Sequence, residues 1–222
     1  MVKALTFDNT YFKLFDADPN NQKDAELLWR YSRACYNFQT TIGNDEAKKK
    51  LLLQDGQKLA EDALKIDDKN FYAVKFAAIN AGSLTDHLGT KEKIQLGYIF
   101  KGYLDKALAM KPAEHTLLHM RGRFAYSVAN LSWLERKAAA AFYADPPKAT
   151  FDEAIVDFLE VEKITPGTWI ENLLYLAKCY LAKGDKKSAL NYLNQLITLT
   201  PVDEAEKEAI NEAQALIAKH SK

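Results

Sequence analysis

A short pattern of small and bulky residues recurs four times along this 222-residue chain, and it limits the possible folds more than any other feature. Its members are separated by 4, 3 and 5 residues, which places the first three on one face of an α-helix. Three of the copies end in proline, which stops a helix. The copies are Gly56, Ala60, Ala63 and Asp68; Phe100, Leu104, Ala107 and Pro112; Ala154, Phe158, Val161 and Pro166; and Ala189, Leu193, Leu196 and Pro201. Such internal repetition predicts stacked helical repeats.

A second helical pattern precedes the repeated one and completes a helix pair. In the last pair, apolar residues from Leu173 to Tyr180 keep helical spacing and are followed by a turn at Lys183–Asp185. Earlier in the chain, LLWRYSRACY and LLHMRGRFAY align without a gap, and Gly122 falls where two helices crossing closely need a small residue. This is the arrangement of a tetratricopeptide unit of about 34 residues. We therefore predict an all-α, tetratricopeptide-like right-handed solenoid of about nine to eleven helices.

The repeats also predict the organisation of the chain. We expect an N-terminal segment or first helix over 1–24 and a tetratricopeptide-like domain over 25–222. Its units cover roughly 25–69, 70–113, 114–167 and 168–201, and a capping helix covers 203–219. The gap between the two helical patterns is 9 residues in the last unit but 20, 19 and 29 residues in the first three. The first three units should therefore contain inserted helical segments, as longer helices or an extra short helix.

Local signals agree with an all-helical chain. Thr150 and Thr168 are each followed three residues later by glutamate (Glu153 and Glu171), the spacing of a helix capping box. No segment alternates strictly between apolar and polar residues, so we predict no sheet. The two cysteines, Cys35 and Cys179, lie within apolar helical patterns, and we interpret them as buried thiols.

Composition and missing motifs exclude several classes of function. The chain has 30 basic and 30 acidic residues, whereas a nucleic-acid-binding domain is usually basic, so we expect no nucleic-acid partner. Neither a signal peptide nor a transmembrane segment is apparent, which favours the cytoplasm. Phosphate-binding loops and nucleophile motifs are missing as well. His115 and His119 are spaced as metal ligands can be, but no third ligand accompanies them. We expect neither catalysis nor a cofactor.

Three strings carry a more specific resemblance. They are GTKEKIQLGYIFKGYLDKAL from Gly89, GRFAYSVA from Gly122 and NLSWLERKAAAAFYADPPKAT from Asn130. Together they resemble the regulator of microtubule dynamics family, a eukaryotic group with a tetratricopeptide-like domain, from about Glu26 to the last helix. The resemblance implies association with microtubules and the mitotic spindle. It also implies, for some members, lipid handling at organelle contacts through an N-terminal membrane anchor. Because we find no anchor in this sequence, we expect it to be a soluble, cytoskeletal member.

The segment Asn130–Asp145 is the least repeat-like part of the sequence. Trp133 is a candidate anchor for a partner, and Arg136 is a candidate contact for an anion, because buried Trp and Arg are common at the centres of interfaces. Two alternatives remain open at this point. Trp133 could instead fill the core, and Arg136 could pair with Glu135 or another neighbouring carboxylate.

Charged and aromatic residues supply the remaining candidates. A positive patch for the acidic tails of tubulin, or for lipid phosphates, would gather several of Lys91, Lys93, Arg121, Arg123, Arg136 and Lys137; the alternative is an ordinary solvated helix face. A concave groove would be lined by Tyr98, Phe100, Tyr103, Phe124 and Tyr126, unless these residues fill the core.

Three functional hypotheses follow. The first is a microtubule-associated interaction protein that contacts tubulin or a spindle protein. The resemblance extends it to spindle function and chromosome segregation. The second is a carrier of lipid or another apolar ligand in an inner cavity, and the third is an adaptor that binds a protein helix or peptide in the groove. Only the first predicts salt-sensitive binding, because salt screens exposed charges.

Overall fold

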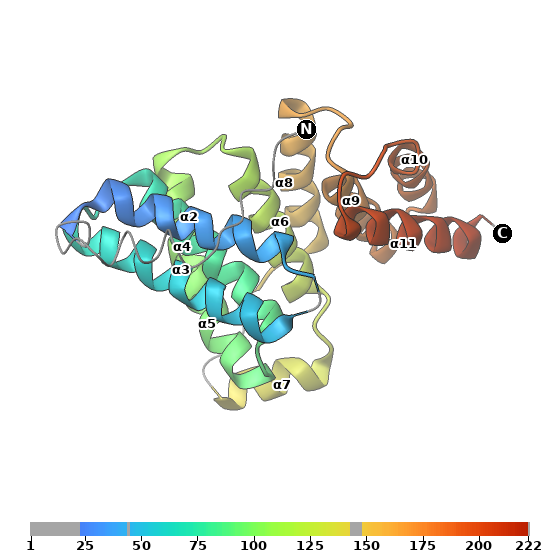
Figure 1. Cartoon of the computed structure of the whole chain (residues 1–222). Coiled ribbons are helices and arrows are strands. Elements are labelled where there is room, and N and C mark those ends of the chain that lie inside the picture. The colour runs from blue at the N-terminus through green and yellow to red at the C-terminus, as the bar shows by residue number, and fades with distance from the viewer. Residues whose placement is uncertain (1–22, 44, 143–147, 222) are drawn as a thin grey trace. The chain divides into compact units, whose positions relative to one another are not determined.

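The computed structural model describes residues 23–43, 45–142 and 148–221, and every regular element in those residues is a helix (Figure 1). The prediction of an all-α fold without a sheet is therefore confirmed for this part of the chain. The chain forms two compact units, unit 1 over Met1–Pro112 and unit 2 over Ala113–Lys222. The predicted N-terminal segment lies almost wholly outside the described residues. None of the described helices is both long and apolar enough to cross a membrane.

Unit 1 is built around α4, a helix whose small and apolar residues are buried on nearly every side. The helices are α2 (Ala25–Thr41), α3 (Glu46–Ile66), α4 (Phe71–Leu84), the 3-10 turn η2 (Thr85–His87) and α5 (Thr90–Met110). Helix α4 packs against α2, α3 and α5. Its alanines allow this close approach, and Asn70 caps its start by accepting the N–H of Ala73 at 3.1 Å.

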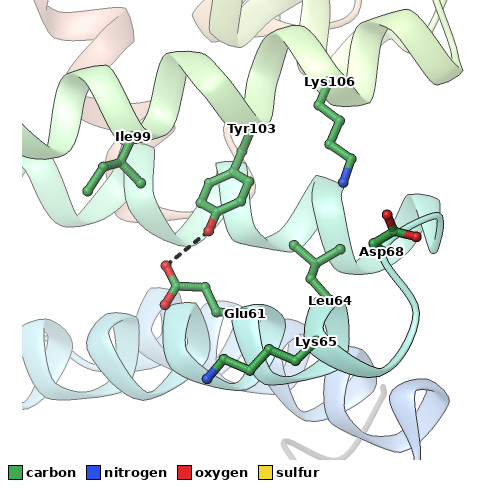
Figure 2. Close-up of a pocket in the computed structure, with 7 residues that line it drawn as sticks. All are labelled: Glu61, Leu64, Lys65, Asp68, Ile99, Tyr103 and Lys106. Carbon is green, nitrogen blue, oxygen red and sulfur yellow. Dashed lines mark hydrogen bonds between the residues drawn. The ribbon is translucent and has the colours of Figure 1, made fainter.

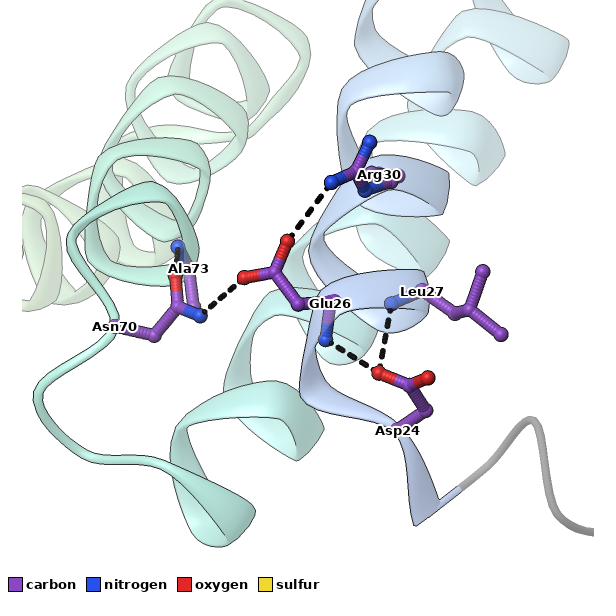
Figure 3. A network of polar contacts seen from close by, with 6 residues as sticks. All are labelled: Asp24, Glu26, Leu27, Arg30, Asn70 and Ala73. Atoms are coloured by element: carbon purple, nitrogen blue, oxygen red, sulfur yellow. Dashed lines mark hydrogen bonds and ion pairs between the residues drawn. The ribbon is translucent and has the colours of Figure 1, made fainter.

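A polar contact joins the beginnings of α2 and α4 (Figure 3). Asp24 caps α2 by accepting the N–H groups of Glu26 at 2.8 Å and Leu27 at 3.3 Å. The Glu26 carboxylate accepts from Arg30 at 2.9 Å and from the side-chain amide of Asn70 at 3.0 Å. The two helix caps are thus connected through one carboxylate.

Gly56 lies where α3 packs tightly against α4. A Cβ atom at this position would lie 2.5 Å from Oδ1 of Asn80, which is fully buried. The Asn80 amide cannot easily move, because it donates to Ser32 Oγ at 3.0 Å and to the Phe76 carbonyl at 2.9 Å. Packing therefore requires the small residue that begins this first copy of the repeated pattern.

We expect Gly56→Ala to destabilise unit 1 by about 1–3 kcal/mol, the usual range for overpacking a core. Chemical denaturation followed by circular dichroism would measure the loss. Gly102→Ala in α5 is the matched control, because nothing lies within 4 Å of a Cβ added there. Equal stability of the Gly56→Ala variant and the wild type would contradict this account.

Unit 2 contains α6 (His115–Ala129), α7 (Trp133–Phe142), α8 (Phe151–Ile164), α9 (Ile170–Ala182), α10 (Lys186–Leu196) and α11 (Glu204–His220). Helices α6 and α8 cross closely at Gly122, where an added Cβ would lie 2.7 Å from the ring of Phe158. The close crossing expected at Gly122 is confirmed. The turn from α9 to α10 also follows the sequence, because Gly184 has a φ of 82° that other residues rarely adopt.

The inserted segments are helical, as predicted. Helices α3 and α5 each have 21 residues, whereas α10 has 11. The third insertion contains the extra helix α7. The longer second helices of unit 1 and the added helix of unit 2 thus account for the irregular spacing of the repeats.

One capping prediction is confirmed and the other is wrong. Thr150 and Glu153 form a complete capping box at the start of α8. Helix α9 instead begins at Ile170 after Trp169, and no side chain caps it. The glutamate expected in the second box, Glu171, accepts from Arg123 at 2.8 Å. Because Arg123 on α6 binds this carboxylate, Glu171 does not accept the backbone N–H of Thr168 as a capping box requires.

Both cysteines are buried, which confirms their interpretation as core thiols. Burial, with a smaller contribution from the charge of Asp55, raises the pKa of Cys35 to about 12. Burial likewise raises the pKa of Cys179 to about 12. Both thiols should therefore stay protonated, and so unreactive, through the neutral and mildly alkaline range.

We expect the folded protein to react slowly with a thiol reagent at mildly alkaline pH. Both thiols should react at once after unfolding, because the thiolate is the reactive species and burial no longer disfavours it. A colorimetric thiol titration with and without denaturant measures this difference. Rapid labelling of either cysteine in the folded protein would show that the thiol is more accessible than the structure indicates.

Candidate partner-binding surfaces

Arg121 and Arg123, two of the residues suggested by the sequence for a positive patch, form ion pairs. Arg121 donates to both carboxylate oxygens of Asp157, at 2.8 Å from Nε and 2.6 Å from a terminal nitrogen. The Asp157 side chain is only 6% exposed, whereas that of Arg121 is 45% exposed. Arg123 pairs with Glu171, and its guanidinium lies 5.0 Å from the ring centroid of Tyr175. Much of the charge of both arginines is therefore neutralised within unit 2.

A buried polar network continues from Glu171 into the core. His119 is 2% exposed, and its Nδ1 lies 3.1 Å from the side-chain oxygen of Asn172. Asn172 in turn donates to the Phe158 carbonyl at 3.1 Å and to Glu162 at 2.7 Å. Burial raises the pKa of Glu171, but its contact with His119 and the charge of Arg123 outweigh this effect and lower it overall. The network therefore joins α6, α8 and α9.

Helix α7 presents Trp133 to solvent, with 68% of the residue exposed. The alternative that Trp133 fills the core is therefore wrong. Lys137 lies over this ring, with Nζ 4.0 Å from the centroid. Arg136 donates to the Val128 and Ala129 carbonyls at 2.7 and 3.4 Å, so it binds the last carbonyls of α6. It does not pair with Glu135, which accepts from Ser132. Residues 143–147, which include the end of the segment Asn130–Asp145, lie outside the described residues.

The lysines at the start of α5 are exposed. Lys91 and Lys93 both lie in the first turn, and Lys93 Nζ is 3.9 Å from an Asp86 oxygen. The side chains of Lys93 and Asp86 are 55% and 59% exposed, so their attraction is weak. Lys91 and Lys93 belong to unit 1, whereas Arg121 and Arg123 belong to unit 2.

The aromatic residues predicted to line a groove have different surroundings. Phe100 is 6% exposed and belongs to the core. Tyr98 and Phe124 are half-buried. Tyr126 packs against Phe151 and Tyr175, with ring centroids 5.7 and 5.4 Å away.

Tyr103 does line an open groove, which runs between α3 and α5 in unit 1 (Figure 2). The groove has a volume of about 500 Å³, and its lining residues are Glu61, Leu64, Lys65, Asp68, Ile99, Tyr103 and Lys106. The Tyr103 hydroxyl donates to Glu61 at 3.2 Å. Burial and the nearby Glu61 charge raise the pKa of Tyr103 to about 12. The groove therefore combines a short apolar floor with charges of both signs.

A second surface of unit 1 combines aromatic rings with cations, and we call it the aromatic–cation cluster. It consists of Trp29, Arg30 and Arg33 on α2, Phe71, Tyr72 and Phe76 on α4, and Lys111 after α5. Trp29 stacks on Tyr72 with ring centroids 4.7 Å apart. Its indole is almost completely buried, while 45% of Tyr72 is exposed.

The sequence analysis missed this cluster, although part of its signal was present. Trp29 and Arg33 are four residues apart, so they share one face of a helix. The contributions of Tyr72 and Lys111 depend on the packing of α2 against α4 and on where α5 ends. Sequence spacing does not supply either.

Comparison with known proteins places this arrangement in context. Residues 2–221 match the model of a family described as regulator of microtubule dynamics protein 1-3. The chain is 42% identical over 200 residues to Regulator of microtubule dynamics protein 1 of Caenorhabditis elegans, covering 90% of this chain and 87% of that protein. Its identity with Regulator of microtubule dynamics protein 3 of Xenopus laevis is 37%, over 86% of this chain and 41% of that protein. Its identity with Regulator of microtubule dynamics protein 2 of Bos taurus is 33%, over 91% of this chain and 49% of that protein. The chain thus spans less than half the length of the last two relatives.

The fold has a solved counterpart as well. A monomeric IFIT1 mutant, solved with Gppp-AAAA, superposes with a TM-score of 0.51 at 17% identity, covering 93% of this chain and 47% of that chain. At this identity the likeness concerns the fold alone. It supports the prediction of a tetratricopeptide-like helical repeat protein.

Proposed function

Because this chain belongs to the regulator of microtubule dynamics family, we propose that it is a non-catalytic, microtubule-associated protein of the cytoplasm. It binds tubulin or a spindle protein through surface charges, and in this way regulates the spindle and chromosome segregation. The observation that carries the proposal is the 42% identity with the Caenorhabditis elegans relative, of which this chain covers 87%.

The described surfaces are compatible with electrostatic binding. On unit 1, the start of α5 and the aromatic–cation cluster carry cations whose carboxylate partners among the described residues are weak or lacking. Acidic tails of tubulin would find complementary charge there, and complementary charge mainly accelerates encounter and fixes orientation. No group of three potential metal ligands occurs among the described residues.

The proposal is tested by imaging dynamic microtubules grown from purified tubulin with and without the purified chain. We expect the chain to change the growth rate, the shrinkage rate or the frequency of switching between them, in proportion to its concentration. Heat-denatured protein serves as the control. Unchanged dynamics at concentrations that saturate the lattice would contradict a regulatory role.

The groove between α3 and α5 favours a second candidate function, that of an adaptor for a peptide or helix. Four of its seven lining residues are charged, which suits a peptide better than the acyl chain of a lipid carrier. Peptides selected from a random library on the wild type, but not on a Tyr103→Ala variant, would support it. If the variant selects the same peptides as the wild type, the groove is not their binding site.

A further inference from the structure

We propose that the aromatic–cation cluster of unit 1 is a docking site for an acidic peptide segment. The inference rests on the proposed function, because it assigns the surface through which an acidic segment of a microtubule would be bound. None of the basic residues singled out from the sequence belongs to this surface.

Stacked rings hold the cations in place. Trp29 is stacked on Tyr72 at 4.7 Å and on Phe76 at 6.0 Å between centroids. The guanidinium carbons of Arg30 and Arg33 lie 4.8 and 5.5 Å from the Trp29 centroid. A guanidinium held over an indole is already oriented, so less side-chain entropy is lost when it binds a ligand.

Lys111 adds a third cation to this surface, beside the rings of α4. Its Nζ lies 4.1 Å from the Phe71 centroid and 5.1 Å from the Tyr72 centroid. Arg33 and Lys111 are thus linked by a chain of contacts through Trp29 and Tyr72, none longer than 5.5 Å. The exposed Tyr72 supplies an apolar contact within the same surface.

Two of the three cations keep their hydrogen-bond donors available. Arg30 already donates to Glu26, whose other oxygen accepts from Asn70 (Figure 3). By contrast, no carboxylate of the described residues lies within ion-pair distance of Arg33 or Lys111. Ring contacts use the face of the guanidinium and leave its N–H edge free for a carboxylate. The surface therefore carries uncompensated positive charge.

An acidic peptide fits this surface better than a nucleic acid or a membrane. Nucleic-acid binding without sequence preference needs several exposed aromatic faces on which successive bases stack. Trp29 is only 5% exposed, and Tyr72, although 45% exposed, already stacks on Trp29. Membrane insertion needs protruding apolar groups, and Tyr72 is the cluster's only large apolar side chain among the exposed ones. The carboxylates of an acidic peptide need only the N–H donors of Arg33 and Lys111, which remain available.

The test compares a double variant, Arg33→Gln with Lys111→Gln, with the wild type. Fluorescence anisotropy would follow a labelled peptide of alternating glutamate and glycine at low salt. We expect binding to weaken about tenfold, since each exposed ion pair contributes up to about 1 kcal/mol. The matched control, Lys58→Gln with Lys186→Gln, makes the same change in net charge at exposed positions elsewhere and should bind as the wild type does.

A labelled oligothymidylate and anionic vesicles, titrated in parallel, separate the other ligand classes. Equal peptide binding by the wild type and the double variant would overturn the proposal. The proposal would also be overturned if the wild type bound oligothymidylate or vesicles more tightly than the peptide and the double variant lost that binding. So these results separate the ligand classes.

Failure of the assigned surface can be distinguished from failure of the proposed function. If the wild type changes microtubule dynamics but the double variant behaves identically, the assigned surface is wrong and the function stands. If the double variant loses peptide binding but the wild type has no effect on microtubules, the assigned surface is right and the proposed function is wrong.

Discussion

Replacing Phe158 with alanine is expected to lower the free energy of unfolding of unit 2 by about 3–5 kcal/mol. Phe158 is fully buried on α8, and its ring fills the space that Gly122 leaves on α6. It also contacts His119 and Tyr175, with ring centroids 5.5 and 6.0 Å away. Truncation would leave a cavity where three helices meet, so both the hydrophobic transfer energy and packing contacts are lost.

The measurement is hydrogen exchange followed by mass spectrometry, because the two units need not unfold together. We expect faster exchange in the peptides of α6, α8 and α9 and little change in unit 1. Val156→Ala on the same helix is the control, because Val156 is 65% exposed and should change stability by less than about 0.5 kcal/mol. Similar effects of the two substitutions would show that Phe158 is not a core residue.

Replacing Arg121 with alanine is expected to cost about 2–3 kcal/mol, although the sequence suggested this arginine for binding a partner. Its removal leaves the Asp157 carboxylate, 6% exposed, without the two hydrogen bonds that it now accepts from Arg121. The expected loss is below the range for fully buried pairs because the Arg121 side chain is 45% exposed.

A double-mutant cycle distinguishes a buried unpaired charge from a simple loss of contacts. If the isolated carboxylate is the cause, Arg121→Ala combined with Asp157→Ala should be more stable than Arg121→Ala alone. Lys163→Ala, which removes the exposed pair with Glu160 on the same helix, should cost at most about 1 kcal/mol. A cost of that size for Arg121→Ala as well would mean that its pair contributes no more than a surface ion pair.

Periodicity predicted the parts of this fold that depend on packing alone. The repeated pattern put a small residue at Gly56, and the alignment of the preceding helical pattern put one at Gly122. The structure shows Asn80 and Phe158 filling the space beside them. Closely crossing helices need a small residue whichever residue lies opposite, so such positions can be recognised in a single sequence. The inserted helical segments were predictable for the same reason, since extra residues between two helices must still satisfy their backbone hydrogen bonds.

Charged residues were harder to interpret, because their role depends on which carboxylate lies opposite. Arg123 and Glu171 are 48 residues apart in sequence, yet they pair across two helices. That pairing also took Glu171 from the expected capping box. The aromatic–cation cluster has the same origin, because Lys111 joins Tyr72 only once α4 and α5 have packed. Sequence spacing orders residues within a helix, but it does not determine which helices meet.

Co-sedimentation with stabilised microtubules, across a salt series and with the acidic tubulin tails left intact or removed by protease, tests the central claim most directly. The account predicts that the purified chain pellets with intact microtubules at low salt. Retention should fall steeply as salt rises, because exposed charges are screened beyond about 10 Å at ordinary ionic strength. Removal of the tails should reduce retention at every salt concentration. A chain that stays in the supernatant with intact microtubules even at low salt would contradict direct binding to tubulin.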